Sequence, residues 1–424
     1  MEINQLHHLF LESTGICTDT RKLKKGNIFF ALKGDNFNGN NFAKSALEDG
    51  ANYVVIDEKK ETNNNRFIQV KDCLKTLQQL ANYHRKFLNI PIIAITGSNG
   101  KTTTKELIRE VLSKKFKTVS TQGNLNNHIG VPLTLLSMNK QTEMGIVEMG
   151  ANHQGEIEAL CKITQPDYGY ITNFGKAHLE GFGGVEGVIK GKSELYRHLI
   201  KNEKTIFINY DDEIQVEKSK GTEVISFSEG NEATYQITFV KASPYVEIST
   251  EELEIHSKLI GNYNAKNIAA AICIGSYFKV PQQAIKEAIE TYSPNNNRSQ
   301  IIQKNTNQII LDAYNANPTS MKAALENLKA MDTKNKVVVL GDMFEIGNTA
   351  SEEHQNIVNL LEEYNFSQAY VCGSNFHGVH TNNIQKFKDF ESLSKHLKNT
   401  TIKNSTILIK GSRGMKLERV LDFI

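Results

Sequence analysis

The chain has 424 residues, of which 39% are hydrophobic and 23% are charged. This length and composition exclude a disordered polymer and a single small module, and predict about three globular domains. The 49 Lys and Arg nearly cancel the 47 Asp and Glu and leave a net charge of +2. No basic block supplies the footprint of a nucleic-acid-binding protein, so we expect no DNA or RNA partner.

The sequence also argues against disulfides and a membrane anchor. The five cysteines have no CxxC spacing, so we expect reduced thiols. The longest apolar run, residues 268–274, is far shorter than the ~18 residues of a membrane span. Residues 1–10 lack the basic and apolar regions of a signal peptide. We expect a cytoplasmic monomer without a membrane span.

Residues 1–88 predict a small mixed α/β domain. Short strands are expected at 27–32, 53–56 and 67–70. Apolar residues recur at helical spacing over 72–88. Pro91 follows, and because proline disfavours helix in the residue before it, we place a domain boundary after residue 88.

Residues 89–296 predict a central mononucleotide-binding α/β domain of the P-loop type. A buried strand at 92–95 leads into a glycine loop and then a helix. Alternating apolar and polar residues between about 222 and 257 predict a small antiparallel insertion. Further buried strands are expected at 145–148, 169–173 and 205–209.

Residues 297–424 predict a C-terminal Rossmann-like domain with a doubly wound sheet. It begins within the polar stretch 293–299. Helices are expected after Pro318, Ser351 and Glu391, and they alternate with predicted strands. These strands are placed at 308–312, 336–341, 369–372 and 406–410.

The strongest chemical signal lies between the first strand and first helix of the central domain. Glycines let backbone N–H groups surround phosphate oxygens at a helix N-terminus, where a lysine adds positive charge and a threonine hydroxyl can reach Mg²⁺. Ile95 stands where the standard motif has its first glycine, so the loop is a short variant. We interpret it as a phosphate-binding loop rather than a simple glycine turn, and the family resemblance described below implies that its ligand is ATP. Its residues are Thr96, Gly97, Ser98, Asn99, Gly100, Lys101, Thr102 and Thr103.

Two further polar residues follow predicted strands. Glu148 either holds Mg²⁺ opposite Lys101, or is a helix N-cap or a solvated carboxylate at a strand end. His178 is either a metal ligand or a structural histidine. A phosphate loop alone leaves kinase, GTPase and ligase open.

Nine segments in a fixed order resemble those of the Mur ligases. The similarity runs from about Thr18 to Arg419, and DAYNANP and GDMFEIG resemble the dipeptide-adding member of the family. The segments are TGSNGKTTTK, GNLNNHIGVPLTLL, EMGANHQGEI, NFGKAHLEGFG, KGKSEL, GNYNAKNIAAA, LDAYNANPTSM, GDMFEIG and KGSRGMKLE.

The resemblance implies an ATP-dependent amide ligase of peptidoglycan synthesis. Its substrates would be UDP-N-acetylmuramoyl-tripeptide and D-alanyl-D-alanine, joined through an acyl phosphate. Two Mg²⁺ ions and Lys101 would neutralise the charge that develops on the phosphate oxygens. Two alternatives stay open: a sister ligase that adds a single amino acid, and a non-catalytic ATP-binding regulator.

The resemblance also assigns the catalytic and metal-binding residues by position. It implies a first Mg²⁺ site at Thr102 and Glu148 and a second at His178 and Lys192, with Lys101, His178 and Lys192 as the catalytic residues. Because an ammonium group repels Mg²⁺, the family's solution is carbamylation by CO₂, and we expect this modification on Lys192. The alternative for Lys192 is an exposed helix lysine.

The remaining implied residues would bind nucleoside and substrates. Asn267, Arg298 and Asp312 match the family's adenine and ribose contacts, and Asp312 would reach ATP only when the third domain closes on the middle one. Asn317 is equally well placed to cap the helix that begins at Pro318. The matching substrate contacts are Thr20 and Arg21 for the diphosphate, Asn124, Asn126 and Asn127 for the sugar or diphosphate, and Asn315 and Asn317 for the dipeptide.

Overall fold

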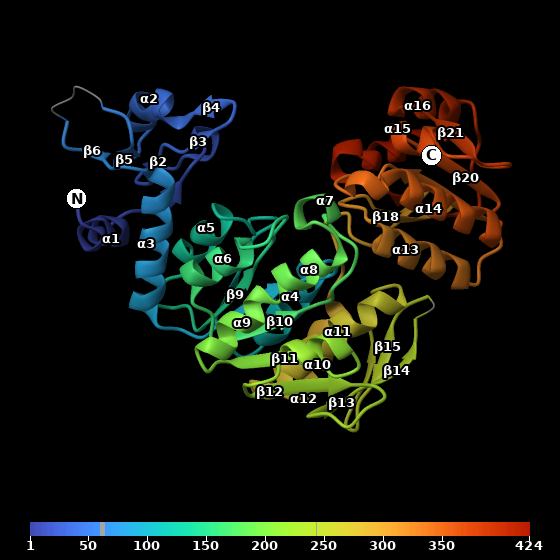
Figure 1. Ribbon diagram of the computed structural model, residues 1–424, viewed down its shortest axis with the longest axis horizontal. Coiled ribbons are helices and arrows are strands. Elements are labelled where there is room, and N and C mark those ends of the chain that lie inside the picture. Colours follow the sequence, from blue (N-terminus) through green and yellow to red (C-terminus); the bar gives the residue numbers. More distant parts are fainter. Residues whose placement is uncertain (60–63, 243) are drawn as a thin grey trace.

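The computed structural model describes residues 1–59, 64–242 and 244–424. Three α/β units follow one another along the chain. Figure 1 shows the N-terminal and C-terminal units standing apart above the middle unit, which contacts both of them. No helix of the described ranges is long and apolar enough to cross a membrane.

The N-terminal unit is built on a four-stranded parallel sheet with the order β1-β2-β5-β6. The sheet is flanked by α1 (Ile3–Leu11), α2 (Ala43–Glu48) and a β3–β4 hairpin (Lys33–Gly34 and Phe37–Asn38). The predicted mixed α/β domain is therefore confirmed. The strands are β1 (Ile16–Cys17), β2 (Ile28–Phe30), β5 (Tyr53–Ile56) and β6 (Phe67–Gln69).

Helix α3 (Cys73–Leu88) joins this unit to the middle one, as Figure 1 shows. It begins at Asp72, whose side chain accepts a hydrogen bond from the Lys75 N–H, and it ends at Asn89 in a left-handed conformation. The Arg85 guanidinium donates to the carbonyl oxygen of Thr164 (3.1 Å) and to the Asp167 carboxylate (2.7 Å). Both acceptors belong to the middle unit, so these bonds tie α3 to it.

A buried histidine pair lies at the same junction. The nitrogens His7 Nε2 and His84 Nδ1 are 3.0 Å apart, and His84 Nε2 lies 2.9 Å from the carbonyl oxygen of Met138. Burial lowers the pKa of His7 to about 4, and the neighbouring His84 contributes to this shift. Helices α1 and α3 thus meet the middle unit through two neutral imidazoles.

The middle unit contains a seven-stranded parallel sheet with the order β13-β12-β11-β10-β7-β9-β8. Helices on both faces bury its central strands, which explains their nearly continuous apolar runs. The strands are β7 (Ile92–Thr96), β8 (Thr118–Ser120), β9 (Met144–Glu148), β10 (Tyr168–Ile171), β11 (Thr205–Asn209), β12 (Val224–Ser228) and β13 (Tyr235–Gln236). The helices are α4 (Lys101–Leu112), α5 (Gly130–Leu136), α6 (Glu156–Thr164), α7 (Leu179–Phe182), α8 (Val185–Lys192), α9 (Glu194–Lys201), α10 (Glu213–Lys218), α11 (Asn262–Tyr277) and α12 (Gln282–Thr291).

The predicted antiparallel insertion at 222–257 is only partly correct. A three-stranded antiparallel sheet exists, but it begins at β14 (Thr238–Lys241) and continues through β15 (Glu247–Ser249) and β16 (Glu254–His256). The preceding β12 and β13 instead extend the parallel sheet. Strands near a sheet edge are half exposed, so their sequence alternates whether their neighbour is parallel or antiparallel.

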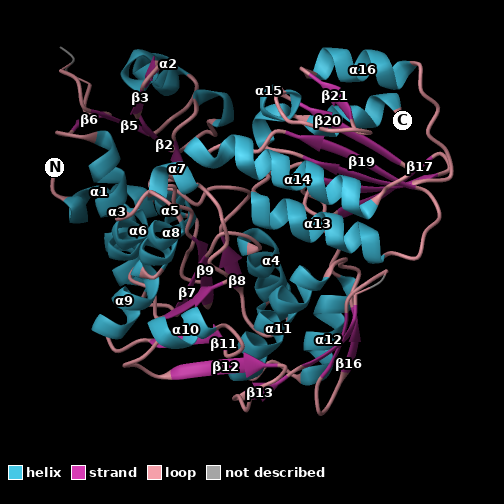
Figure 2. Ribbon diagram, turned by 45° about the vertical axis from the view of Figure 1, so that its right-hand side comes forward, coloured by secondary structure: helices cyan, strands magenta, loops and turns pink. Residues whose placement is uncertain are grey.

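The C-terminal unit is a six-stranded sheet with the order β17-β18-β22-β19-β20-β21, seen with its helices in Figure 2. All its pairings are parallel except that of β17 with β18. The predicted doubly wound domain is confirmed, while β17 and β21 were not predicted. The strands are β17 (Gln300–Lys304), β18 (Asn307–Asp312), β19 (Lys336–Gly341), β20 (Gln368–Cys372), β21 (Gln385–Phe387) and β22 (Thr406–Lys410), and the helices are α13 (Pro318–Ala330), α14 (Ala350–Tyr364), α15 (Ser374–His377) and α16 (Phe390–Lys398).

Candidate active site

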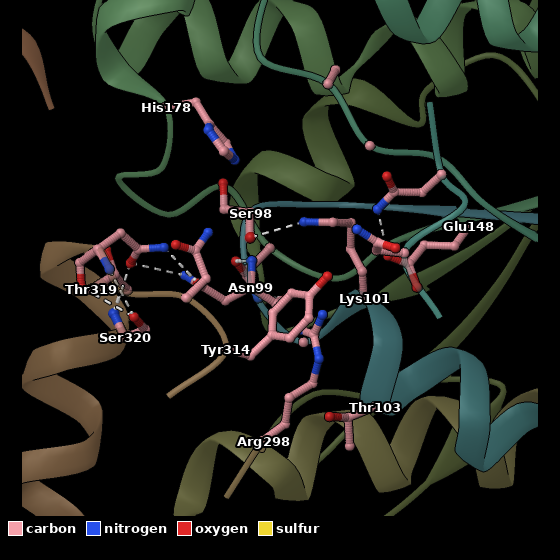
Figure 3. A pocket seen from close by; sticks show the side chains of 18 of the residues that line it. Ser98, Asn99, Lys101, Thr103, Glu148, His178, Arg298, Tyr314, Thr319 and Ser320 are labelled. Atoms are coloured by element: carbon pink, nitrogen blue, oxygen red, sulfur yellow. Dashed lines mark hydrogen bonds between the residues drawn. The ribbon is translucent and has the colours of Figure 1, made fainter. Parts of the chain in front are cut away.

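A cavity of about 580 Å³ lies between the middle and C-terminal units. It opens where β7 and β9 end, which is the edge at which parallel α/β sheets bind their ligands. Figure 3 shows Lys101 and Glu148 of the middle unit on one side of it, and Thr319 and Ser320 of α13 on the opposite side. Both units therefore build the cavity wall.

The glycine loop connects β7 to α4 at this edge. Gly97 has φ +140°, and a Cβ added there would collide with Thr172 Oγ1. Gly100, the N-cap of α4, has φ +81°, and a Cβ there would lie 2.6 Å from Asn267 Oδ1. Only glycine fits these two positions, so backbone N–H groups form the surface at the helix N-terminus, as an anion site requires.

Lys101 begins α4, and its ammonium group turns back over the loop. Its Nζ donates to the carbonyl oxygens of Gly97 (2.7 Å) and Ser98 (3.0 Å). Burial lowers the pKa of Lys101 to about 8; the Glu148 carboxylate opposes this shift, and Arg298 adds to it. A desolvated cation therefore stands beside the surface of N–H groups.

Glu148, at the end of β9, is a buried carboxylate with one unsatisfied oxygen. Its Oε1 accepts hydrogen bonds from Thr102 Oγ1 (3.2 Å) and Asn126 Nδ2 (2.8 Å). Its Oε2 has no hydrogen-bond partner, and the closest cation in an ion pair with it is Lys105, 3.9 Å away. A buried oxygen of this kind, next to a threonine hydroxyl, fits a hard cation such as Mg²⁺. The alternative of a solvated strand-end acid is wrong, because Glu148 is only 1% exposed.

Lys192 is buried as well, so the alternative of an exposed helix lysine is also wrong. Its side chain is 1% exposed, its Nζ donates to the carbonyl oxygen of Ala151 (3.1 Å), and the nitrogen lies 4.8 Å from the centre of the Phe182 ring. Burial holds the pKa of Lys192 well below its usual range, and the charge of Lys101 adds to this. The described residues contain no group of three His, Cys, Asp or Glu side chains placed to hold a metal. Any ion there would need further ligands, such as phosphate oxygens or a modified lysine.

His178 lies on the cavity wall at the start of α7. Its Nδ1 contacts the carboxylate of Glu345, which belongs to the C-terminal unit. This contact holds the pKa of Glu345 below its usual range. His178 and Glu148 thus face the same cavity from different segments.

Three predicted nucleoside residues meet at the junction of the two units. Asn267 lines the cavity from α11. Arg298 lies in the connecting segment, and Figure 3 shows it beside the Tyr314 ring. The Arg298 guanidinium carbon is 3.7 Å from the centre of that ring. Asp312 accepts the Lys410 ammonium (2.5 Å) and lines the same cavity. The C-terminal unit therefore lies against the part of the middle unit that carries the phosphate loop.

Asn317 has the capping role that the sequence offered, together with a contact that was not predicted. Its Oδ1 accepts the Ser320 N–H (2.9 Å), so Asn317 caps α13. Its Nδ2 donates to Asn99 Oδ1 of the phosphate loop (2.7 Å). The cap of α13 therefore forms a direct bridge between the two units.

The other predicted residues are divided between the cavity and its surroundings. Thr20 and Arg21 lie in a short 3₁₀ turn of the N-terminal unit, where Arg21 forms a bidentate pair with Asp19 (2.9 and 2.8 Å), and they do not line the cavity. Thr96, Gly97, Thr102 and Lys192 lie behind the cavity wall. The predicted residues that do line it are Ser98, Asn99, Gly100, Lys101, Thr103, Asn124, Asn126, Asn127, Glu148, His178, Asn267, Arg298, Asp312, Asn315 and Asn317.

Several residues of the site were not predicted. Asn173 brackets the phosphate loop, because its Oδ1 accepts the Asn99 N–H (3.1 Å) and its Nδ2 donates to the Asn99 carbonyl (3.0 Å). Lys410 and Tyr314 reach the cavity beside Asp312. Lys410 ends a predicted strand and Tyr314 stands in DAYNANP, so the sequence around each residue could have indicated its place in the site.

Comparisons with known proteins match all three units. The Mur ligase family catalytic domain matches residues 12–85, the Mur ligase middle domain matches 95–275, and the Mur ligase glutamate ligase domain matches 297–413. The chain is 33% identical over 422 residues to the UDP-N-acetylmuramoyl-tripeptide--D-alanyl-D-alanine ligase of Bacillus subtilis, covering 96% of this chain and 92% of the relative.

Two solved structures are similar over nearly the whole chain. A crystal structure of MurF from Acinetobacter baumannii has a TM-score of 0.87 and 30% identity, with 98% of this chain and 97% of the other covered. MurF ligase from Thermotoga maritima, solved in complex with ADP, has a TM-score of 0.85 and 27% identity over the same shares of the two chains. The similarity therefore includes the fold, the order of the units and the segment that carries the phosphate loop.

Proposed function

The chain belongs to the Mur ligase family, and we propose that it is the ATP-dependent ligase that joins D-alanyl-D-alanine to UDP-N-acetylmuramoyl-tripeptide. The products are UDP-N-acetylmuramoyl-pentapeptide, ADP and phosphate, and the reaction belongs to the synthesis of the peptidoglycan precursor. One observation carries this proposal: identity of 33% over 96% of the chain to a ligase named for this reaction.

The chemistry requires activation of a carboxylate, which is a poor electrophile at neutral pH. The γ-phosphoryl group of ATP passes to an oxygen of the tripeptide carboxylate and forms an acyl phosphate, with ADP as the leaving group. The amine of D-alanyl-D-alanine then attacks the carbonyl carbon, and phosphate leaves with that oxygen. Because the phosphate is the leaving group, the protein needs no nucleophile of its own, and its task is to position and to neutralise charge.

ATP binds to the phosphate loop in this proposal. Backbone N–H groups from Gly97 to Thr103 surround the phosphates, and Lys101 exchanges its loop carbonyls for phosphate oxygens. Asn267, Arg298 and Asp312 hold the nucleoside, with the Arg298–Tyr314 stack as a flat surface on the cavity wall. The three units then act as domains at 1–88, 89–296 and 297–424.

Residues in the cavity wall and directly behind it would hold two Mg²⁺ ions. Thr102 and Glu148 would hold the first, since Glu148 Oε2 is buried and lacks a partner. His178 and Lys192 would hold the second. When bound, Mg²⁺ neutralises charge on the phosphate oxygens of the transition state.

Carbamylation of Lys192 would give the second ion an anionic ligand. Burial favours the neutral amine of Lys192, and the neutral amine is the form that attacks CO₂. The new bond joins Nζ to carbon, one proton passes to solvent, and the product carries a negative charge. The lowered pKa and the burial of this lysine support the modification.

The remaining residues would hold the two substrates. Thr20 and Arg21 of the N-terminal domain bind the uridine diphosphate, and Asn124, Asn126 and Asn127 bind the sugar or diphosphate where they line the cavity. Asn315 and Asn317 face the incoming dipeptide. Closure of the C-terminal domain shields the acyl phosphate from water.

The test is ADP release by the full-length protein with UDP-N-acetylmuramoyl-tripeptide. D-alanyl-D-alanine is compared with D-alanine, L-lysine and diaminopimelate as the second substrate, and turnover is expected with the dipeptide alone. Turnover with a single amino acid but not with the dipeptide would assign the chain to a sister ligase. In addition, oxygen-18 in the tripeptide carboxylate is expected in the released phosphate, and its absence there would exclude the acyl phosphate.

A further inference from the structure

His178, which is proposed as a metal ligand, takes part in a contact between two domains. Glu345 lies in the GDMFEIG segment that follows β19, and its carboxylate contacts Nδ1 of His178 across the interface. The same segment packs on α7: the Glu180 N–H donates to the Glu345 carbonyl oxygen (3.4 Å), and a Cβ added to Gly347 would lie 3.2 Å from Glu180 Cβ. The two backbones are therefore in close contact, so the two segments pack against each other and do not meet through the side chains of His178 and Glu345 alone.

Both partners have a left-handed backbone. His178 has φ +53° and Glu345 has φ +60°. Residues with a Cβ adopt this conformation at a cost of about 1–3 kcal/mol, and it persists where the surroundings enforce it. The two strained positions directly face each other.

The Glu345 segment is held from within the C-terminal domain. The Phe344 N–H donates to Ser412 Oγ (2.9 Å), and the Met343 N–H donates to His354 Nε2 (3.0 Å). The buried Asp342 fixes the start of the segment by accepting two backbone N–H groups of α15 at 2.9 Å. Glu345 is consequently presented to His178 by a segment with three anchors.

The chemistry of the pair selects one form of the imidazole. A carboxylate only accepts hydrogen bonds, so His178 must carry its proton on Nδ1. In the neutral imidazole the lone pair then resides on Nε2, and a histidine that binds a metal needs such a deprotonated nitrogen. Since His178 lines the cavity, the C-terminal domain sets the form in which this imidazole meets a ligand.

We propose that Glu345 is a positioning residue that holds His178 as the Nδ1–H tautomer across the domain interface, so that the second metal site is complete only when the C-terminal domain is closed. The inference rests on the proposed function. It adds a residue to that function and makes the closed arrangement a condition for binding the second metal ion.

A neighbouring contact supplies a matched control. Lys176, two residues before His178, pairs with Glu353 of α14 at 2.7 Å across the same interface. If Glu345 served only to hold the domains together, removal of the Glu353 charge would have the same effect. The variants are therefore Glu345→Ala and Glu345→Gln, with Glu353→Gln as the control.

The first measurement reads the tautomer without any metal. Long-range proton–nitrogen spectra are recorded at pH 8 on full-length protein with ¹⁵N-labelled histidine, and a His178→Gln variant assigns the signal. The Nδ1–H form is expected in the wild type, in Glu353→Gln and in Glu345→Gln, whose amide oxygen still accepts. Glu345→Ala is expected to move toward the Nε2–H form. An unchanged signal in Glu345→Ala, or an Nε2–H wild type, would overturn the proposal.

The second measurement counts manganese by electron paramagnetic resonance, with a non-hydrolysable ATP analogue and bicarbonate present. Two Mn²⁺ ions are expected in the wild type, and Glu345→Ala should weaken the second by about 10- to 100-fold and leave the first unchanged. Equal affinities for the second Mn²⁺ in Glu345→Ala and wild type, or the same loss in Glu353→Gln, would overturn the role of Glu345 and leave the proposed function untouched. A wild type that binds no second Mn²⁺ would overturn both this role and the two-metal part of the proposed function.

Discussion

Replacement of Lys101 by methionine tests whether the phosphate loop holds a cation at the expense of folding stability. Burial lowers the pKa of Lys101 from 10.5 to about 8. The unfolded chain therefore binds this proton more tightly, so stability is reduced below pH 8 and recovers as the pH rises toward 10.5. At 1.36 kcal/mol per pKa unit, the reduction at neutral pH is about 3 kcal/mol.

The assay is urea unfolding of the ligand-free protein at pH 7 and at pH 10.5. Methionine has a similar shape and no charge, so the free energy of unfolding of Lys101→Met relative to wild type should fall by about 2–3 kcal/mol between pH 7 and pH 10.5. The comparison across pH cancels the hydrogen bonds to Gly97 and Ser98, which the variant lacks at both values. Lys162→Met, at a lysine whose side chain is 69% exposed, is the matched control and should show no such change.

The charge of Lys101 that lowers folding stability should strengthen nucleotide binding. Because the ammonium group would meet phosphate oxygens, Lys101→Met should weaken binding of a non-hydrolysable ATP analogue by about 10-fold or more. A variant with the same pH dependence of stability as the wild type would refute the reasoning about burial. Unchanged nucleotide affinity would refute the assignment of the loop.

Three further predictions follow from other parts of the molecule. Lys192→Ala should lose activity by about 100-fold or more and regain part of it with added short carboxylates; full activity without them would contradict carbamylation. Asn317→Ala should lose about 1 kcal/mol of stability with the cap of α13 and raise the KM for D-alanyl-D-alanine, and an unchanged melting temperature would contradict the cap. The pKa of His7 is lowered to about 4, so folding stability should fall as the pH drops from 6.5 through 4. In His7→Phe this acid-dependent loss, measured by thermal unfolding, should be smaller than in wild type.

The features predicted best from the sequence are local ones. The phosphate loop is contiguous, and its glycines are required by contacts within the same domain, so its pattern alone indicates its shape. The buried strands of the two large sheets are nearly continuous apolar runs for the same reason. In contrast, the alternating residues 222–236 did not reveal that β12 and β13 join the parallel sheet.

The parts that were missed depend on contacts between distant segments. Glu345 meets His178 only because two domains face each other, and no spacing along the chain signals that contact. Lys192 is a lysine in a helix, and such residues are usually exposed, so its burial follows from the packing of α8 and not from its own pattern. Resemblance to a family drew attention to Lys192 and to the GDMFEIG segment that contains Glu345, but not to the contact of Glu345 with His178.

The bonds that tie α3 to the middle domain have a consequence for substrate selection. Arg85 fixes the end of this helix to Thr164 and Asp167, which holds the N-terminal unit, proposed to bind the uridine diphosphate, at a set distance from the phosphate loop. That distance then sets the length of substrate whose terminal carboxylate can reach the phosphate loop. A precursor whose peptide is one residue too short would leave its terminal carboxylate away from the phosphate loop, and rotation of the C-terminal domain would do nothing to bring it closer.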